Sequence, residues 1–412
     1  MANTTLTADI IAKEAVMILD NELVMAKKVF RGYEEEFKDV NGYKPGATIS
    51  ISKPTDFTVR KGATMSVQDV TEGKTSITVD QFAGVDFAFS STDLTLSIGE
   101  LSKRVIRPAL IRLANQVDQD LMSLYRSVPS WVGTPGQKID SYADFAQAPE
   151  RMDELANPTD GRCAVLSPSD HWGLMGSQTA LYIEDAAKGA YRKGSLGMIG
   201  GVDTYMSQNV PTHTVGVATG TPLVNGANQV SAYAAVKDTN TQSLITDGWT
   251  NSTTGILKAG DVITIAGVYA VNPVTKAVLP FLRQFVVTAD ADSGASTGPA
   301  TLTISPAIIV SGAFQNCSAA PADNAVITVL GTGGTGYRQN MVFTEGAFAL
   351  VSVPLVKPPG AVDVARQSYK GTNVRVIPVY DGVNDVSKWR LDILYGVKTI
   401  DPRLAHRLSG KA

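Results

Sequence analysis

The sequence is poor in the residues that build disulfides and metal sites. Its 412 residues include two cysteines, Cys163 and Cys317, and three histidines, His171, His213 and His406. Two cysteines cannot form a disulfide framework, and such low usage is typical of a protein made in a reducing compartment. Three scattered histidines are too few for a metal cluster. We therefore expect no bound metal and no cofactor.

Long apolar runs and net charge are also lacking. No run of 18 apolar residues occurs, and the first residues lack the charged start and apolar core of a secretion signal, so we expect no membrane partner. The 36 basic and 39 acidic residues nearly cancel, to a net charge of −3. This balance argues against a surface that grips nucleic acid electrostatically. It suits a wall that encloses nucleic acid without binding it.

The clearest pattern that is present predicts a long helix from Pro108 to Val128. Proline fits the first turn of a helix, where its missing N–H costs nothing. Apolar residues then recur every three or four positions and share one stripe: Leu110, Leu113, Val117, Leu121, Leu124 and Val128. A helix of this length spans roughly 30 Å and can act as a spine for other elements. By residue type, Asp118 and Asp120 are interpreted as solvated surface.

Two stretches with different sequence patterns precede this helix. Residues 7–28 have apolar side chains on two sides of a helix, which predicts an arm that contacts two surfaces, one of them on a neighbouring subunit. From residue 39 to 90, short β-type runs, among them Phe57–Val59, are separated by glycine and charged residues. The middle of this stretch has few large apolar side chains and cannot bury much of itself. We expect an extended hairpin that protrudes from the body.

After the long helix, the sequence pattern predicts a mixture of helices and strands, which we call the α/β texture. Ser141–Ala156 is predicted to be a helix, Cys163–Leu166 a buried strand, Pro168 the start of a short helix, and Leu196–Met206 a pair of glycine-broken strands. The same texture returns after residue 340, with strands predicted at Ala347–Val353, Asn373–Val379 and Trp389–Val397.

Between residues 211 and 339 charged residues become rare and short strands recur. The predicted strands are Ala232–Val236, Asp261–Ala266, Gln284–Thr288, Ala300–Ser305 and Ala325–Leu330. This spacing is typical of a small antiparallel barrel or sandwich. Because the α/β texture lies on both sides, the β module is interpreted as an insertion.

The sequence contains no convincing set of catalytic residues. GTGGTG at Gly331–Gly336 matches a dinucleotide-binding pattern, but no helix is predicted after it and Glu345 comes too early for the ribose-binding acid. A flexible glycine linker is the better interpretation. Cys163 lies near Asp170 and His171 in sequence, yet it precedes an apolar pair and is interpreted as a core residue. We expect no enzyme.

Four stretches carry a resemblance to a known family. They are RLANQVD at Arg112–Asp118, GGVDTYMSQNVP at Gly200–Pro211, FTEGAFAL at Phe343–Leu350 and LDILYGVKTIDPRLAHRL at Leu391–Leu408. In this order they cover most of the chain, which resembles the major capsid proteins of tailed double-stranded DNA bacteriophages, with the Hong Kong 97-type fold. LKAGDVITIAGV at Leu257–Val268 is similar to the signature strand pair of a β-barrel domain that is inserted into the coat proteins of certain short-tailed phages.

The resemblance implies an α+β fold with a definite division of the chain. It implies an N-terminal arm at 1–38, an extended β-hairpin loop at 39–90, a peripheral domain with the spine helix at 91–130 joined by strands from 360–400, the first part of an axial domain at 131–210, the inserted antiparallel β-barrel domain at 211–339 and the completion of the axial and peripheral domains at 340–412. The segment Asp238–Gly255 departs from the family, whose loop between capsomers is longer and more charged.

The resemblance also implies a function. The chain would form pentamers and hexamers and build an icosahedral head shell around packaged double-stranded DNA, without sequence-specific binding. Assembly in the host cytoplasm would need a scaffolding protein and a portal protein and give a procapsid that matures by expansion into the virion capsid. We hypothesise that Asp9 and Glu14 receive a basic scaffold segment, and that Arg60, Lys61 and Lys74 make ion pairs between subunits.

Three alternatives remain open at this stage. A phage tail-tube or decoration protein would share the β-rich module but lack the spine helix. An encapsulin-type compartment shell would share the fold but assemble around protein cargo. A cytosolic enzyme would use GTGGTG as a nucleotide site.

Overall fold

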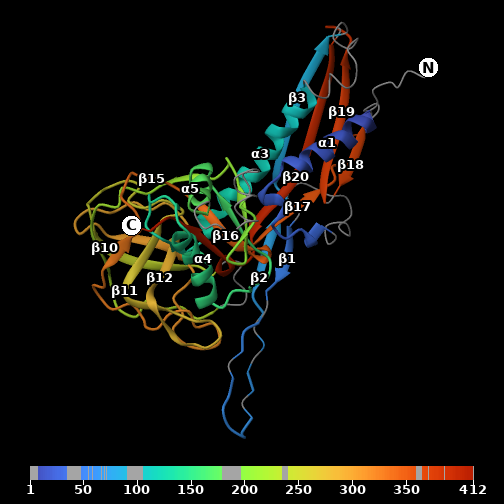
Figure 1. The fold of residues 1–412 in the computed structure, drawn as a ribbon. Helices are drawn as coiled ribbons and strands as arrows, with labels where there is room; N and C mark the ends of the chain where they lie inside the picture. Colours follow the sequence, from blue (N-terminus) through green and yellow to red (C-terminus); the bar gives the residue numbers. More distant parts are fainter. Residues whose placement is uncertain are drawn as a thin grey trace. The chain divides into compact units, whose positions relative to one another are not determined.

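The structure, a computed structural model, is shown in Figure 1. It describes residues 8–34, 48–53, 55–57, 59–65, 67, 68, 70, 72–90, 105–178, 196–233, 240–358, 364–369, 371–384 and 386–411. The chain divides into two compact units. The first combines Met1–Ser50, Ser76–Met122 and Phe348–Lys398, and the second combines Ile51–Thr75, Ser123–Ala347 and Thr399–Ala412.

The described residues of the first unit include a sheet of antiparallel strands and the α-helices α1 and α3. Its elements are α1 (Ala8–Glu22), β3 (Gln81–Ser90), α3 (Arg107–Ser123), β17 (Phe348–Val353), β18 (Ala365–Tyr369), β19 (Thr372–Asp381) and β20 (Val386–Thr399). The strand order is β17-β20-β19-β18, and β3 also pairs with β20, from Gln81 opposite Tyr395 to Ser90 opposite Val386. The three strands predicted after residue 340 are thereby confirmed as β17, β19 and β20.

The predicted spine helix is confirmed as α3. Leu110, Leu113, Val117 and Leu121 are buried along one stripe, and the chain continues as a 3-10 helix over Leu124–Ser127. The interpretation of Asp118 as solvated surface is wrong, because its side chain is buried in the same stripe. Residue type alone suggested exposure, whereas helical spacing places position 118 beside Val117 and Leu121.

The predicted arm helix is confirmed as α1, which packs against β18 and β19 of its own chain. Ile11, Ala15 and Leu19 are buried on the packed side. Met17, from the second apolar side that the sequence suggested, is 50 % exposed. One of the two predicted packing faces is therefore satisfied within the chain.

The chain between α1 and α3 contains a two-stranded sheet of β1 (Thr48–Ser52) and β2 (Lys74–Thr78). Lys53 N–H donates to Gly73 O at 2.7 Å where the two strands end. Beyond that point the chain runs as a long loop that leaves β1 and returns to β2 (Figure 1). Phe57 and Val59 are not in a strand, so the short strand predicted there is wrong.

The second unit contains a mixed sheet with the order β4-β21-β16-β5-β7-β6. The elements are β4 (Trp131–Val132), α4 (Tyr142–Glu154), β5 (Arg162–Leu166), α5 (Pro168–Gln178), β6 (Met198–Ile199), β7 (Val202–Met206), β16 (Asn340–Thr344) and β21 (Ala405–Leu408). The helices and strands predicted from residue 141 to 206 are confirmed. Ser141 caps α4, since its Oγ accepts from Asp144 N–H at 3.1 Å. β4, β16 and β21 were not predicted.

A separate antiparallel sheet lies between residues 220 and 329, with the order β14-β11-β12-β13-β10-β9. The strands are β9 (Gly220–Val224), β10 (Gln242–Trp249), β11 (Val262–Val271), β12 (Val278–Val287), β13 (Ala300–Ser305) and β14 (Ile327–Val329). A separate strand pair flanks this region in the sequence: β8 (Thr212–Thr214) precedes it, β15 (Gly336–Arg338) follows it, and the two pair with each other. A bridge between Leu223 and Val326 brings the two edges of the sheet together.

Four of the five strands predicted in this region are confirmed. Of the fifth, Ala232 and Tyr233 are not in a strand, and residues 234–236 lie outside the described part of the chain. The segment Asp238–Gly255, interpreted as a shortened loop, instead contains β10, which pairs with β13 and β9.

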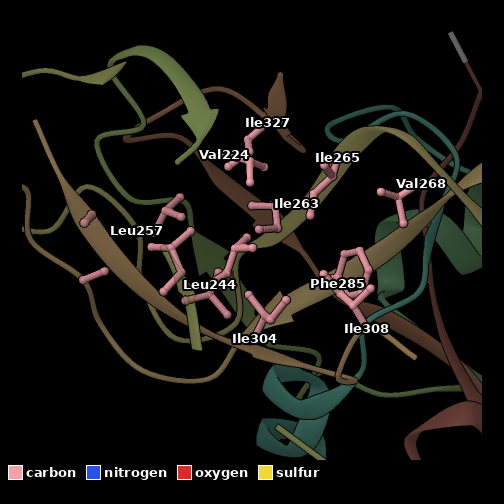
Figure 2. Packing of buried hydrophobic residues seen from close by; sticks show 14 of the residues in the cluster. Val224, Leu244, Leu257, Ile263, Ile265, Val268, Phe285, Ile304, Ile308 and Ile327 are labelled. Atoms are coloured by element: carbon pink, nitrogen blue, oxygen red, sulfur yellow. The ribbon is translucent and has the colours of Figure 1, made fainter. Parts of the chain in front are cut away.

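The antiparallel sheet has its own apolar core. Figure 2 shows side chains from β9 to β14 gathered inside it. The fully buried members include Val224, Leu244, Ile256, Leu257, Ile263, Ile265, Phe285, Leu302, Ile304 and Ile308. Because each buried aliphatic side chain contributes roughly 1.5 to 3 kcal/mol, this cluster is the main source of stability for the sheet.

Candidate assembly surfaces

The loop between β1 and β2 exposes large apolar side chains. Val59 is 93 % exposed, Val67 79 % and Met65 75 %, and Phe57 and Val70 are exposed as well. We call these five residues the apolar strip. The sequence interpretation of this stretch as poor in large apolar residues missed the strip. Its signal was the two-residue alternation of Phe57 with Val59 and of Met65 with Val67, because such alternation places side chains on one side of an extended chain.

The cations predicted in this region are all exposed. Arg60 and Lys61 lie in the loop, and Lys74 opens β2. The guanidinium of Arg60 donates to the carbonyl oxygens of Gly62 and, at 2.7 Å, of Thr64. Arg60 therefore stabilises the turn of the loop itself.

The two acidic residues predicted for the arm both lie on α1. Glu14 is half-buried. The side chain of Asp9 lies outside the described residues.

A closed ring of buried polar groups connects the antiparallel sheet to the mixed sheet. His213 lies between two partners: its Nε2 is 2.8 Å from Asp261 Oδ1, and its Nδ1 is 3.0 Å from Tyr125 Oη. Arg407 on β21 donates from Nη1 to Gly260 O at 2.7 Å and lies 5.2 Å from the Tyr125 ring centroid. We call Tyr125, His213, Gly260, Asp261 and Arg407 the junction ring.

Arg407 is an unusual member of the ring because it is fully buried. Burial lowers its pKa to about 9, although Tyr125 and Asp261 act in the opposite direction. The guanidinium also lies 5.8 Å from the Trp131 ring centroid. Contact with two aromatic rings compensates in part for its removal from water.

Gly260 completes the ring, and both its backbone conformation and its close neighbours favour glycine there. Its φ is +106°, a conformation that favours glycine. A Cβ atom would lie 3.1 Å from His213 Cε1 and 3.2 Å from Arg126 Cγ. The glycine therefore lets the turn before β11 approach the 3-10 helix Leu124–Ser127.

The groups considered for nucleophilic chemistry are structural. Cys163 is buried on β5, where its Sγ donates to Phe343 O at 3.6 Å. Both oxygens of Asp170 are engaged: Oδ1 accepts from Ile139 N–H at 3.1 Å, and Oδ2 accepts from Ser167 Oγ at 2.6 Å and Asn340 Nδ2 at 2.9 Å. The interpretation of Cys163 as a core residue is confirmed.

The GTGGTG run links β14 to β15, so a strand rather than a helix follows it. Its glycines permit close backbone contact. A Cβ atom at Gly333 would lie 2.1 Å from Val217 O. Packing against residue 217 explains the glycine, and the strand–loop–helix context of a dinucleotide site is not present.

The described residues show two further negative findings. Their helices are all too short or too polar to cross a bilayer. Within the same residues, no three side chains of His, Cys, Asp or Glu gather in an arrangement that could hold a metal ion.

Comparison with known proteins gives consistent matches. A family model described as "P22 coat protein - gene protein 5" matches residues 1–410. A major capsid protein of Acyrthosiphon pisum secondary endosymbiont phage 1 is 22 % identical over 380 residues, which are 89 % of each chain. Among solved structures, one from Mycobacterium phage Che8 is 14 % identical with a TM-score of 0.47 and covers 93 % of this chain and 90 % of that chain. The capsid of Ralstonia phage GP4 is 10 % identical with a TM-score of 0.41, over 91 % and 86 % of the two chains.

The family model and the curated relative place the chain among the major capsid proteins of phages. By the family model, which spans nearly its whole length, the chain belongs to the P22 coat protein family. It is a structural protein that forms the capsid shell of the virion.

Proposed function

We propose that the chain builds an icosahedral head shell as a Hong Kong 97-type subunit, in rings of five and six copies. The apolar strip carries this proposal. A monomeric soluble protein seldom leaves a set of large apolar side chains on one extended segment in water. In a shell of identical copies, a neighbouring subunit covers them, and the core of such an interface is apolar.

The elements of the chain have separate roles in this proposal. Residues 1–38 are the arm, 39–90 the extended loop, 91–130 with strands from 360–400 the peripheral domain, and 131–210 with 340–412 the axial domain. Residues 211–339 are an inserted β-barrel domain. The junction ring and the separate core of the antiparallel sheet support this last assignment, since they describe a module with its own interior and a defined attachment.

Charges have a secondary role on the loop. Arg60, Lys61 and Lys74 are candidate partners for carboxylates of a neighbouring subunit. An exposed ion pair contributes at most about 1 kcal/mol, and less at high salt. The apolar strip therefore supplies most of the loop's contribution to assembly, and the cations set its register.

Assembly partners follow from the same proposal. Asp9 and Glu14 attract a basic segment of a scaffolding protein, the shell closes on a portal protein, and the procapsid forms in the host cytoplasm and expands as it fills. The near-neutral charge of the subunit suits a wall around double-stranded DNA that is held without sequence-specific contacts and without catalysis. Scaffold-dependent assembly that survives charge reversal at both Asp9 and Glu14 would remove their role.

Substitution of one strip residue tests the proposal. Val59→Asp places a charge on a side chain that has no packing to lose in the monomer, so its free energy of unfolding should change by less than about 0.5 kcal/mol. Assembly followed by light scattering should slow at least about tenfold, because a buried carboxylate in an apolar interface costs well over 1.4 kcal/mol. Val274→Asp is the matched control, since Val274 is exposed but lies outside the strip. Equal assembly by both variants would contradict the proposal.

A further inference from the structure

The carboxylate of Asp118 holds the chain where it leaves α1. Asp118 lies on α3 and is 2 % exposed. Its Oδ2 accepts from Val24 N–H at 2.7 Å, and its Oδ1 accepts from Ala26 N–H at 3.1 Å. α1 ends at Glu22, and the 3-10 turn Met25–Lys27 follows. One side chain, distant in sequence, thus satisfies two amides at the point where the arm changes direction.

The next part of the arm is held by backbone groups. Phe30 N–H donates to Phe348 O at 3.0 Å, and Leu350 N–H donates to Phe30 O at 3.1 Å. Phe30 thereby forms a parallel bridge beside β17. The attachment at Phe30 uses backbone groups alone. A change of the Asp118 side chain should therefore leave it intact, and it can serve as an internal reference for the attachment at residues 24–26.

A carboxylate at this position has a cost and a specific use. Burial raises the pKa of Asp118, and the backbone donors from residues 24 to 26 only partly oppose that shift. An apolar side chain would avoid the cost of the buried charge but would leave two amide donors unsatisfied. Two equivalent acceptor oxygens can hold two amides of one turn at once, which fixes the position and the direction of the turn.

We propose that Asp118 is a positioning residue for assembly. The two oxygens of its carboxylate hold the amides of Val24 and Ala26, and this clamp fixes the direction of α1 relative to α3 and therefore the way α1 presents its outer face to other proteins. This inference rests on the proposed function of the arm as an assembly surface. Loss of the clamp leaves α1 packed on β18 and β19 and the chain attached at Phe30, but it frees the turn at residues 24–26 and so loosens the exact direction of α1 on the sheet. A shell requires one direction in every copy, so assembly suffers more than folding does.

Two variants separate the clamp from general stability. Asp118→Asn keeps the shape of the side chain but replaces one acceptor oxygen by an NH2 group, which cannot accept from an amide. Asp120→Asn is the matched control on the same helix. The Asp120 carboxylate accepts from Tyr395 Oη and, at 2.9 Å, from Gln116 Nε2.

The decisive measurement is amide hydrogen exchange on the full-length monomer. In Asp118→Asn, exchange at residues 24–26 should become about tenfold faster, the factor expected for one lost hydrogen bond to a charged group. Exchange at Phe30 and Leu350 should not change, and Asp120→Asn should behave as wild type at residues 24–26. Unchanged exchange at residues 24–26, or faster exchange throughout the first unit, would overturn the inference.

Shell formation by the same proteins completes the test. Wild type and both variants are expressed together with the adjacent phage genes, and the particles are counted by electron microscopy. We expect Asp118→Asn to give at least about tenfold fewer closed shells than Asp120→Asn. Equal numbers would overturn the positioning role even if exchange is faster. Absence of shells from wild type would instead contradict the proposed function, while the exchange data would still decide whether the clamp exists.

Discussion

His213 Nε2 lies 2.8 Å from Asp261 Oδ1, and both side chains are buried. The other oxygen of Asp261 accepts from Lys258 N–H at 2.7 Å and from Gly216 N–H at 3.0 Å. A single carboxylate therefore joins β8, the chain after it and the turn before β11. Through His213 it also reaches Tyr125, in the 3-10 helix Leu124–Ser127.

Removal of this carboxylate should be costly. Asp261→Ala leaves two amides and one imidazole without their acceptor, so we expect the free energy of unfolding to fall by about 3 to 5 kcal/mol. Urea unfolding of the full-length monomer checks this. Asp160→Asn, in an exposed turn, should change stability by less than about 0.5 kcal/mol. A loss below about 1 kcal/mol for Asp261→Ala would show that the ring does not carry the junction.

Tyr125 and Asp261 should be energetically coupled through His213. Tyr125→Phe removes the hydroxyl that lies 3.0 Å from His213 Nδ1 and keeps the ring that contacts Arg407, so we expect a loss of about 1 kcal/mol. In a double-mutant cycle, the variant that carries both Tyr125→Phe and Asp261→Ala should lose less free energy of unfolding than the two single variants lose together. The difference should be at least about 0.5 kcal/mol. Additive losses would indicate that the two contacts act independently.

His406 should make the protein sensitive to acid. Burial, followed by the positive charges of Arg151, Arg283 and Arg162, lowers its pKa from 6.5 to about 3. Below pH 6.5 the unfolded chain therefore takes up a proton that the folded chain does not, and stability falls as the pH is lowered toward 3. Since one pKa unit corresponds to about 1.36 kcal/mol, the loss at pH 5 is about 2 kcal/mol.

Unfolding by urea at pH 7 and pH 5 checks this prediction. His406→Gln removes the titrating group, so the drop in stability between the two pH values should be smaller by about 2 kcal/mol than in wild type. The comparison uses the difference within each protein, and a general loss of stability in the variant therefore cancels. The same drop in both proteins would show that His406 is not the source.

The sequence was sufficient for elements with a strong periodic pattern. α3 follows from Pro108 and the apolar stripe, and β13 has the predicted bounds of Ala300–Ser305. β10 was missed because Gln242–Trp249 contains two residues, Asp247 and Gly248, that are rare in strands. Its register with β13 and the burial of Leu244, Thr246 and Trp249 outweigh that local preference.

The candidate surfaces were harder to predict than the fold. In the loop, the sequence pointed to the charged side chains as interface residues. The exposure of the apolar strip could not be predicted, because it depends on whether other parts of the chain pack against these side chains, and only the structure shows that. The junction ring joins residues as far apart as Tyr125, Asp261 and Arg407. Asp118 was misassigned for the same reason, since its partners lie 92 and 94 residues away.

The antiparallel sheet should fold without the rest of the chain. A fragment of residues 211–339 keeps the apolar core of Figure 2 and the contact of His213 with Asp261. It lacks Tyr125, Trp131 and Arg407, so it should unfold cooperatively in urea but at a lower concentration than the same sheet in the full chain. A fragment without a cooperative transition would contradict its interpretation as an autonomous inserted domain.

Electron microscopy of the full-length protein, purified after expression alone and after expression with the adjacent phage genes, tests the central claim most directly. We predict closed icosahedral shells, with uniform shells in quantity only when a scaffolding protein is present. Monomers or small oligomers under both conditions would contradict the account.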